Sequence, residues 1–309
     1  MTFEHYIVTR FNLPIFQAKV GGSLSKSCDR EYLQYRFDLF ERFCMPSMAN
    51  QTNQNFKWFV LFDANTPQDF QRRAWGWHEK YENLVPCFLN LHDYTSISPE
   101  YEDLCTEYDT VVKKYYPSRS LDLDVDRERD LRKVTPQFVM DAIKKCSSNT
   151  PDYYLTTRID NDDAFHKDFV KTVQQRFVQN PKHVVYDYVY SYKYILNEGI
   201  VYRYPLQNGH FLTLAEPTTK LFQSILYWNH LYIEKFVEVE HIYQKPLQTE
   251  LIHGNNVVND FTELSIYGLI YAFFHFRQRD FGYDKVYRSL GRFLRVLAFL
   301  IKKKLFAGK

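Results

Sequence analysis

The sequence predicts an α/β fold in which a mixed sheet is flanked by helices. Strand-like runs at residues 6–9 and 56–63 lie on either side of a stretch with helical periodicity, which is the pattern of a βαβ unit. A third strand-like run, residues 153–157, is again followed by helical spacing. With 309 residues, of which 45% are hydrophobic, the chain is long enough for one main domain with an appendage.

The first strand is expected at residues 6–9, where β-branched and aromatic residues favour extended backbone. From Asp29 onward, large apolar side chains recur at three- and four-residue steps, which predicts a helix that ends at Pro46. Residues 56–63 are apolar over almost their whole length, as expected for a second strand that is buried on both faces.

Two Thr-Pro pairs predict the starts of further helices. Thr66-Pro67 offers an N-cap hydroxyl followed by proline at the first helical position, and the helix should run to about Tyr81. Thr135-Pro136 gives the same signal for a helix that ends near Cys146. Further strands are expected at residues 84–91, 184–192 and 200–204. The last two are joined through a turn, so the second half of the chain should be richer in antiparallel strands.

Three closely spaced carboxylates, Asp160, Asp162 and Asp163, follow the strand at residues 153–157. Apolar residues recur at helical spacing from Phe165 onward, so the acids lie at a strand-to-helix turn. Carboxylates this close repel one another unless a cation lies among them. The carboxyl edge of an α/β sheet suits a site for a metal ion and a diphosphate.

A simpler explanation of the same turn is a solvated helix N-terminus, where aspartate is favoured by capping and by the helix dipole. An EF-hand is excluded by spacing, because a loop that starts at Asp160 would need glycine where Phe165 stands.

Composition excludes several function classes. The 39 basic residues nearly balance the 37 acidic ones, so overall charge gives no reason to expect a nucleic-acid partner. The five cysteines are scattered singly, which argues against a disulfide framework or a zinc knuckle and favours a reducing cytosol. No signal peptide is visible, and no apolar run is long enough to cross a bilayer. We therefore expect a cytoplasmic protein that is soluble or peripheral to the membrane.

Five segments of the sequence resemble the bacterial putative rhamnosyl transferase family, which is of the GT-A glycosyltransferase type. They are HYIVTRFN (residues 5–12), YRFDLFERFCMP (35–46), NQNFKWFVLFD (53–63), TTRIDNDDA (156–164) and HGNNVVN (253–259). The resemblance spans about residues 5–260. It implies a GT-A-like fold and metal-dependent transfer of a sugar from a nucleoside-diphosphate donor to a cell-surface or lipid-linked glycan. Rhamnose is implied only by the name of the family.

The resemblance also implies a set of metal ligands. Asp162 is expected to bind Mn²⁺ or Mg²⁺ directly, Asp160 to face the ribose or a metal-bound water, and His253 to complete the metal shell. Asp163 is expected nearby. By itself His253 would more often be a structural histidine.

Further residues at the ends of predicted strands are expected to bind the donor. Arg158 would neutralise phosphate charge, and the resemblance places Thr9, Arg10 and Asp63 at the same site. By itself Asp63 would more often cap the end of its strand.

An inverting transfer also needs a carboxylate that accepts the proton of the acceptor hydroxyl. Glu216, which follows the strand-like residues 211–215, is the first candidate, and Asp163, Glu240 and Glu250 come after it. An equally good explanation is that Glu216 only supplies a negative charge at the N-terminus of a helix. A retaining mechanism would need no such base.

The end of the chain predicts a basic amphipathic helix over residues 284–309. Its apolar face consists of Val286, Leu290, Phe293, Leu294, Leu297 and Ile301, and its basic face of Arg288, Arg292, Arg295 and Lys302. This pattern is typical of a helix that lies on the anionic inner face of the cell membrane. A helix docked on its own domain would show the same stripe, and both interpretations stay open.

These expectations define one GT-A-like domain, residues 1–283, and the C-terminal helix. Within the domain, a nucleotide-binding half would extend to about residue 163, and an acceptor half would occupy residues 164–283. Two other function classes stay open: a non-catalytic carbohydrate-binding or scaffold protein on the same fold, and a metal-dependent phosphoesterase.

Overall fold

The computed structural model describes residues 1–13, 18–20, 23–25, 28–90, 93–94, 98–115, 125–253, 264–283 and 289–306. Its centre is a seven-stranded mixed sheet with the order β12-β8-β11-β6-β1-β4-β5. The strands are β1 (Phe3–Arg10), β4 (Lys57–Asp63), β5 (Leu84–Leu89), β6 (Tyr153–Arg158), β8 (Val184–Tyr188), β11 (Thr213–Pro217) and β12 (Val239–Ile242). All neighbours pair in parallel except β11, which is antiparallel to both β6 and β8.

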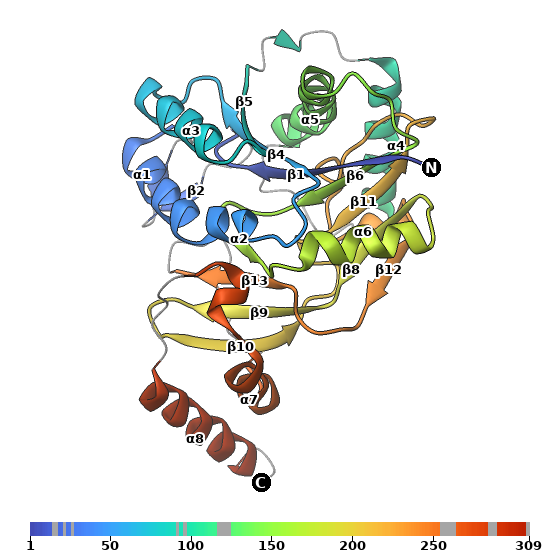
Figure 1. Cartoon of the computed structure of the whole chain (residues 1–309). Coiled ribbons are helices and arrows are strands. Elements are labelled where there is room, and N and C mark those ends of the chain that lie inside the picture. The colour runs from blue at the N-terminus through green and yellow to red at the C-terminus, as the bar shows by residue number, and fades with distance from the viewer. Residues whose placement is uncertain are drawn as a thin grey trace.

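Helices cover both faces of this sheet, because its central strands are apolar on both sides (Figure 1). On one face, Ile7 and Val60 pack with aromatic side chains from the first helical segments, among them Phe37. On the other face, Val8 and Phe59 pack with residues from the helices between β5 and β6. The helices are α1 (Arg30–Leu39), α2 (Met45–Ala49), α3 (Gln68–Lys80), α4 (Pro99–Tyr115), α5 (Val125–Cys146) and α6 (Phe169–Gln179). The predicted α/β architecture, a mixed sheet flanked by helices, is confirmed.

A second, four-stranded sheet has the order β10-β9-β13-β7 and lies beside the first (Figure 1). Its strands are β7 (Ala164–Phe165), β9 (Tyr190–Ile195), β10 (Ile200–Pro205) and β13 (Gln248–Ile252). It carries α7 (Ile266–His275) and α8 (Leu290–Phe306), the predicted C-terminal helix, at the far end of the molecule (Figure 1). The short remaining elements are β2 (Ala18–Val20), β3 (Ser23–Ser25), a π-helical turn (Phe40–Cys44) and two 3₁₀ turns (Ile233–Lys235 and Gln278–Phe281). None of the helices in these parts of the chain is long and apolar enough to cross a bilayer.

Three predicted boundaries are wrong, each for a local reason. The first helical segment continues past Pro46. A π-helical turn precedes α2, so the proline lies in the first turn of α2, where the N–H that it lacks is not required. Helix α5 begins before Pro136, since apolar side chains on both sides of that proline, including Val134 and Val139, pack into one core. The expected strand over residues 184–192 breaks at Val189, where the chain passes from the large sheet into the second one.

Candidate functional site

The aspartate-rich segment lies at the carboxyl edge of the large sheet, directly after β6. The chain adds β4 and β5 to one side of β1 and then places β6 on the other side, so the strand order reverses between β1 and β6. Open sheets with parallel strands bind ligands at the carboxyl ends of the strands where such a reversal occurs. Arg10 ends β1 and Arg158 ends β6, so two cationic residues and the aspartates come to the same edge.

Asp160, Asp163 and His210 form a candidate metal centre, with one ligand atom from each within 4.8 Å of the others. Oδ2 of the almost fully buried Asp163 accepts a hydrogen bond from His210 Nε2 at 2.8 Å, and its Oδ1 accepts one from the Leu251 N–H at 3.0 Å. Among the residues that the structure describes, this is the one group with such spacing. Two carboxylates and an imidazole are a donor set that can hold a divalent metal ion.

Asp162, the predicted direct ligand, has different partners. Its Oδ2 accepts hydrogen bonds from Arg36 Nη1 at 2.9 Å and from His253 Nε2 at 2.9 Å. The Tyr35 hydroxyl lies 2.8 Å from His253 Nδ1, on the other side of the imidazole ring. The structure thus brings Asp162 and His253 together as predicted, but in an ion-pair network with Arg36. Asp160 groups instead with Asp163 and His210.

The ionisation of this centre follows from its burial and its charges. Burial and the neighbouring Asp162 raise the pKa of Asp163 to about 7, although the hydrogen bond from His210 lowers it. Burial lowers the pKa of His210, but its hydrogen bond to Asp163 and the negative charges of Asp163, Asp160 and Glu250 together outweigh this and raise the pKa to about 9. One proton is therefore held in the hydrogen bond between His210 Nε2 and Asp163 Oδ2. A divalent cation bound at Nε2 would replace that proton.

Positive charge surrounds Asp160 and Asp162. Arg158 donates two hydrogen bonds, both of 3.0 Å, to the two carboxylate oxygens of Asp160. Burial opposes ionisation of Asp160, yet Arg158, His210 and Arg10 together hold the pKa of its carboxyl well below the usual range. The buried Nε of Arg36 has no hydrogen-bond acceptor in the described parts of the chain. A phosphate oxygen would supply an acceptor of the right charge for such a donor.

Two of the predicted donor-binding residues have structural partners. Thr9 is fully buried, and its Oγ1 accepts a hydrogen bond from the Trp58 indole N–H at 2.9 Å, so its hydroxyl lies in the core. Asp63 ends β4 and accepts hydrogen bonds from the backbone and side-chain nitrogens of Asn65 at 2.8 and 3.0 Å. These contacts form an Asx turn at the end of β4. Asp63 therefore lies next to the site but does not join Asp160, Asp162 and Asp163.

The structure does not bring Glu216, the first base candidate, to this site. Glu216 pairs with Tyr154 near the start of β6, and Arg158 at its end is four residues, or about 13 Å, further along the strand. Its buried carboxylate accepts backbone hydrogen bonds from Gln223 at 2.8 Å and Ser224 at 3.0 Å. Glu216 thus holds the loop that follows β11.

Of the two remaining base candidates, Glu240 lies away from the site and Glu250 lies near it. Glu240 on β12 pairs with Arg176 of α6, away from the aspartates. Glu250 on β13 accepts a hydrogen bond from the Tyr204 hydroxyl and lies 3.5 Å from Lys193 Nζ. Its negative charge is among those that raise the pKa of His210, so Glu250 lies near the candidate centre.

Sequence reasoning missed His210, Arg36 and Tyr35 as members of the site. His210 stands in a segment between strands with no motif around it, and only the fold places it against Asp163. Arg36 and Tyr35 belong to a helix whose periodicity indicates only a buried face, although both lie in a segment that carries the family resemblance. No signal in the sequence assigned them a role.

Comparison with known proteins confirms part of the resemblance. A family model described as "Putative rhamnosyl transferase" matches residues 4–97, which hold β1, α1 to α3, β4 and β5. The aspartates and His210 lie outside that match. Of the segment at residues 253–259, only His253 is among the described residues. A search of curated proteins found no match.

Among solved structures, the chain is similar to the crystal structure of S. aureus TarS 1-349, with a TM-score of 0.37 and 12% sequence identity. The similarity covers 81% of this chain and 60% of the TarS chain.

Proposed function

We propose that this chain, whose residues 4–97 match the putative rhamnosyl transferase family, is a metal-dependent glycosyltransferase of the GT-A type. The sugar, with rhamnose as the proposed case, would pass from a nucleoside-diphosphate donor to a cell-surface glycan. The observation that carries the proposal is the group of Asp160, Asp163 and His210 at the carboxyl edge of the sheet, with arginines around it. Peripheral contact of α8 with the inner face of the cell membrane belongs to the same proposal.

The residues that would hold Mn²⁺ or Mg²⁺ are Asp160, Asp163 and His210. The imidazole favours Mn²⁺, since Mg²⁺ prefers oxygen ligands alone. The bound ion would neutralise the diphosphate and so make it a better leaving group. Arg158 and Arg36 would bind phosphate oxygens, and each would give up part of its present pairing with an aspartate.

For an inverting transfer, we propose Glu250 as the general base. Its side chain is 18% exposed, so a hydroxyl of an acceptor can reach it. The Tyr204 hydroxyl fixes the orientation of the carboxylate. Glu250 would accept the proton of the acceptor hydroxyl as that oxygen attacks the sugar.

A thermal-shift screen of nucleoside diphosphates with and without Mn²⁺ tests the function. We expect one nucleotide, at about 100 times its Kd and only with Mn²⁺, to stabilise the protein by roughly 2.7 kcal/mol, or about 5 °C. Transfer from the matching nucleotide sugar should follow. Binding without transfer would indicate a binding or scaffold protein, and hydrolysis of phosphate esters a phosphoesterase. The absence of any Mn²⁺-dependent shift would contradict the proposal.

Substituting Glu216 by Gln separates its structural role from a catalytic one. We expect donor turnover within roughly threefold of the wild type, a difference below 1 kcal/mol in the barrier. Stability should fall by about 1–3 kcal/mol, because one buried N–H loses its acceptor. Burial raises the pKa of Glu216 from 4.5 to about 7, so its contribution to stability is full below pH 4.5 and is lost as the pH rises through 7.

Urea unfolding of both proteins between pH 5 and 8 checks this prediction, and the stability difference should narrow as the pH rises. A loss of turnover above roughly 100-fold, equivalent to about 2.7 kcal/mol, with unchanged stability would instead make Glu216 catalytic.

A further inference from the structure

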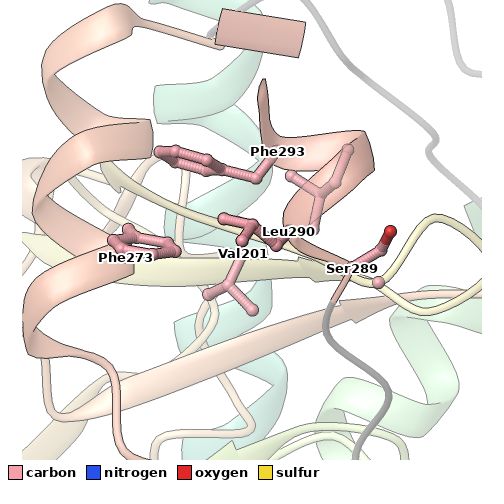
Figure 2. A pocket seen from close by; sticks show the side chains of 7 residues that line it. Val201, Phe273, Ser289, Leu290 and Phe293 are labelled. Atoms are coloured by element: carbon pink, nitrogen blue, oxygen red, sulfur yellow. The ribbon is translucent and has the colours of Figure 1, made fainter. Parts of the chain in front are cut away.

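An apolar pocket of about 270 Å³ lies between the start of β10 and the helices α7 and α8 (Figure 2). It is lined by Gly199, Ile200, Val201, Phe273, Ser289, Leu290 and Phe293. The rings of Phe273 and Phe293 stack with their centroids 4.4 Å apart and form one wall, and Val201 and Leu290 lie opposite them (Figure 2). An apolar cavity of about 150 Å³ holds a benzene-sized molecule, so this pocket has room for a longer hydrocarbon.

Helix α8 has two apolar stripes, and the parts of the domain that the structure describes cover only one of them. The covered stripe, which packs against β9, β10 and α7, consists of Phe293, Val296, Leu297 and Leu300. The second stripe consists of Leu290, Leu294, Ile301 and Leu305, which are 58%, 54%, 44% and 71% exposed. At 3.6 residues per turn, these four positions fall within an arc of about 60°. Docking on the domain therefore does not account for all the apolar residues of the helix.

The charge of α8 points to an anionic partner. The helix carries five basic residues and no acidic residue over Leu290–Phe306. Arg295 and Lys302 lie along one border of the second stripe, as expected for a helix that rests on anionic head groups. Arg292 donates hydrogen bonds to the backbone oxygen of Asn197 at 2.6 Å and to Glu198 at 3.0 Å, which fixes the helix beside the pocket.

We infer that the second stripe and the pocket form one lipid-binding surface. The stripe rests on a bilayer that contains anionic phospholipid, and the pocket takes one acyl chain of such a lipid. Leu290 belongs to both the stripe and the pocket lining, so the two are continuous. This inference rests on the membrane contact in the proposed function and adds a specific site for a hydrocarbon chain.

Binding of decanoate, a single chain with an anionic head, tests the pocket in the full-length protein. Calorimetric titration should show saturable binding, and Val201→Phe, which fills the pocket, should weaken it at least tenfold. The matched control is Val178→Phe on α6, where the side chain is 55% exposed, and it should bind like the wild type. If Val201→Phe does not fold, Ser289→Leu at the pocket lining serves instead. Equal binding by wild type and pocket variant, or no binding by the wild type, overturns the pocket site.

Flotation with vesicles tests the stripe separately. The wild type should float with phosphatidylcholine vesicles that contain phosphatidylglycerol, and the double variant Leu294→Glu/Leu305→Glu should lose most of this binding. Val178→Glu is the matched control and should float like the wild type. Flotation of the double variant at the wild-type level would contradict the inference that the second stripe binds the bilayer. All these variants should keep Mn²⁺-dependent nucleotide binding, so failure of the lipid surface is distinct from failure of the proposed enzyme.

Discussion

Replacing Asp163 by Asn is expected to lower kcat/KM for sugar transfer by about 10³-fold, and His210→Gln should have a similar effect. Asp163 accepts hydrogen bonds from both His210 and Leu251, so the isosteric amide keeps the backbone contact and loses only charge and one ligand oxygen. A metal ion contributes several kcal/mol to a charged transition state, and each 1.36 kcal/mol is tenfold in rate. Steady-state assays with and without Mn²⁺ measure the loss.

The double variant Asp163→Asn/His210→Gln should be about as inactive as either single variant, because ligands of one metal act as a unit. Asp168→Asn is the matched control, since this aspartate lies on the same segment and pairs with Thr52 on the surface. It should keep nearly full activity. If Asp163→Asn keeps both activity and Mn²⁺-dependent nucleotide binding, then Asp160, Asp163 and His210 are not the metal centre.

Several elements in the first half of the fold could be predicted because each of them has a local signal. The run at residues 56–63 is apolar on both faces and becomes β4 (Lys57–Asp63), and the proline after Thr66 marks the start of α3 closely. The strand before the aspartate turn was also predictable, but the predicted helix directly after it is wrong, because Ala164–Phe165 form β7 of the second sheet and α6 begins only at Phe169. What these signals share is that neighbours within a few residues decide them.

The partners within the site could not be predicted in the same way. His210 reaches Asp163 across 47 residues, and Arg36 reaches Asp162 across 126 residues. Such contacts depend on which strands pair, and the local hydrophobic periodicity of a sequence does not determine the order of the strands. Glu216 shows the reverse error. Its place after the strand-like residues 211–215 suggested a carboxylate at the site, but the antiparallel pairing of β11 with β6 places that end of the strand away from the aspartates.

Replacing Arg36 by Met is expected to destabilise the protein by about 3–5 kcal/mol at pH 7.5, although no apolar contact is lost. Nη1 of Arg36 lies 2.9 Å from Oδ2 of Asp162, and the two side chains are only 13% and 10% exposed. Without the guanidinium, a buried carboxylate would keep His253 as its only direct partner among the described residues. Arg36→Lys retains the positive charge and should lose less of the free energy of unfolding than Arg36→Met. Urea unfolding at constant ionic strength measures the differences.

The pH dependence identifies the charge on Asp162 as the cause. Burial raises the pKa of Asp162, but Arg36 and His253 outweigh it, so the folded-state pKa lies below 3.8. Its stabilising contribution is therefore present above pH 3.8 and is lost only as the pH falls through the folded-state pKa. In Arg36→Met, burial and Asp160 are expected to raise the pKa of Asp162. As the pH falls, Asp162 therefore becomes protonated at a higher pH in the variant than in the wild type, and protonation removes the unpaired buried charge. The stability gap to the wild type should be narrower at pH 5 than at pH 7.5.

A double-mutant cycle with Asp162→Asn separates the ion pair from packing. The neutral amide needs no cation, so Arg36→Met should cost much less in the Asp162→Asn background, and the coupling energy should reach about 2 kcal/mol or more. In that background the pH dependence of the Arg36→Met effect should also disappear. If the cost of Arg36→Met is the same in both backgrounds, the methylene stem of Arg36 stabilises the fold by packing, and the buried ion pair contributes little.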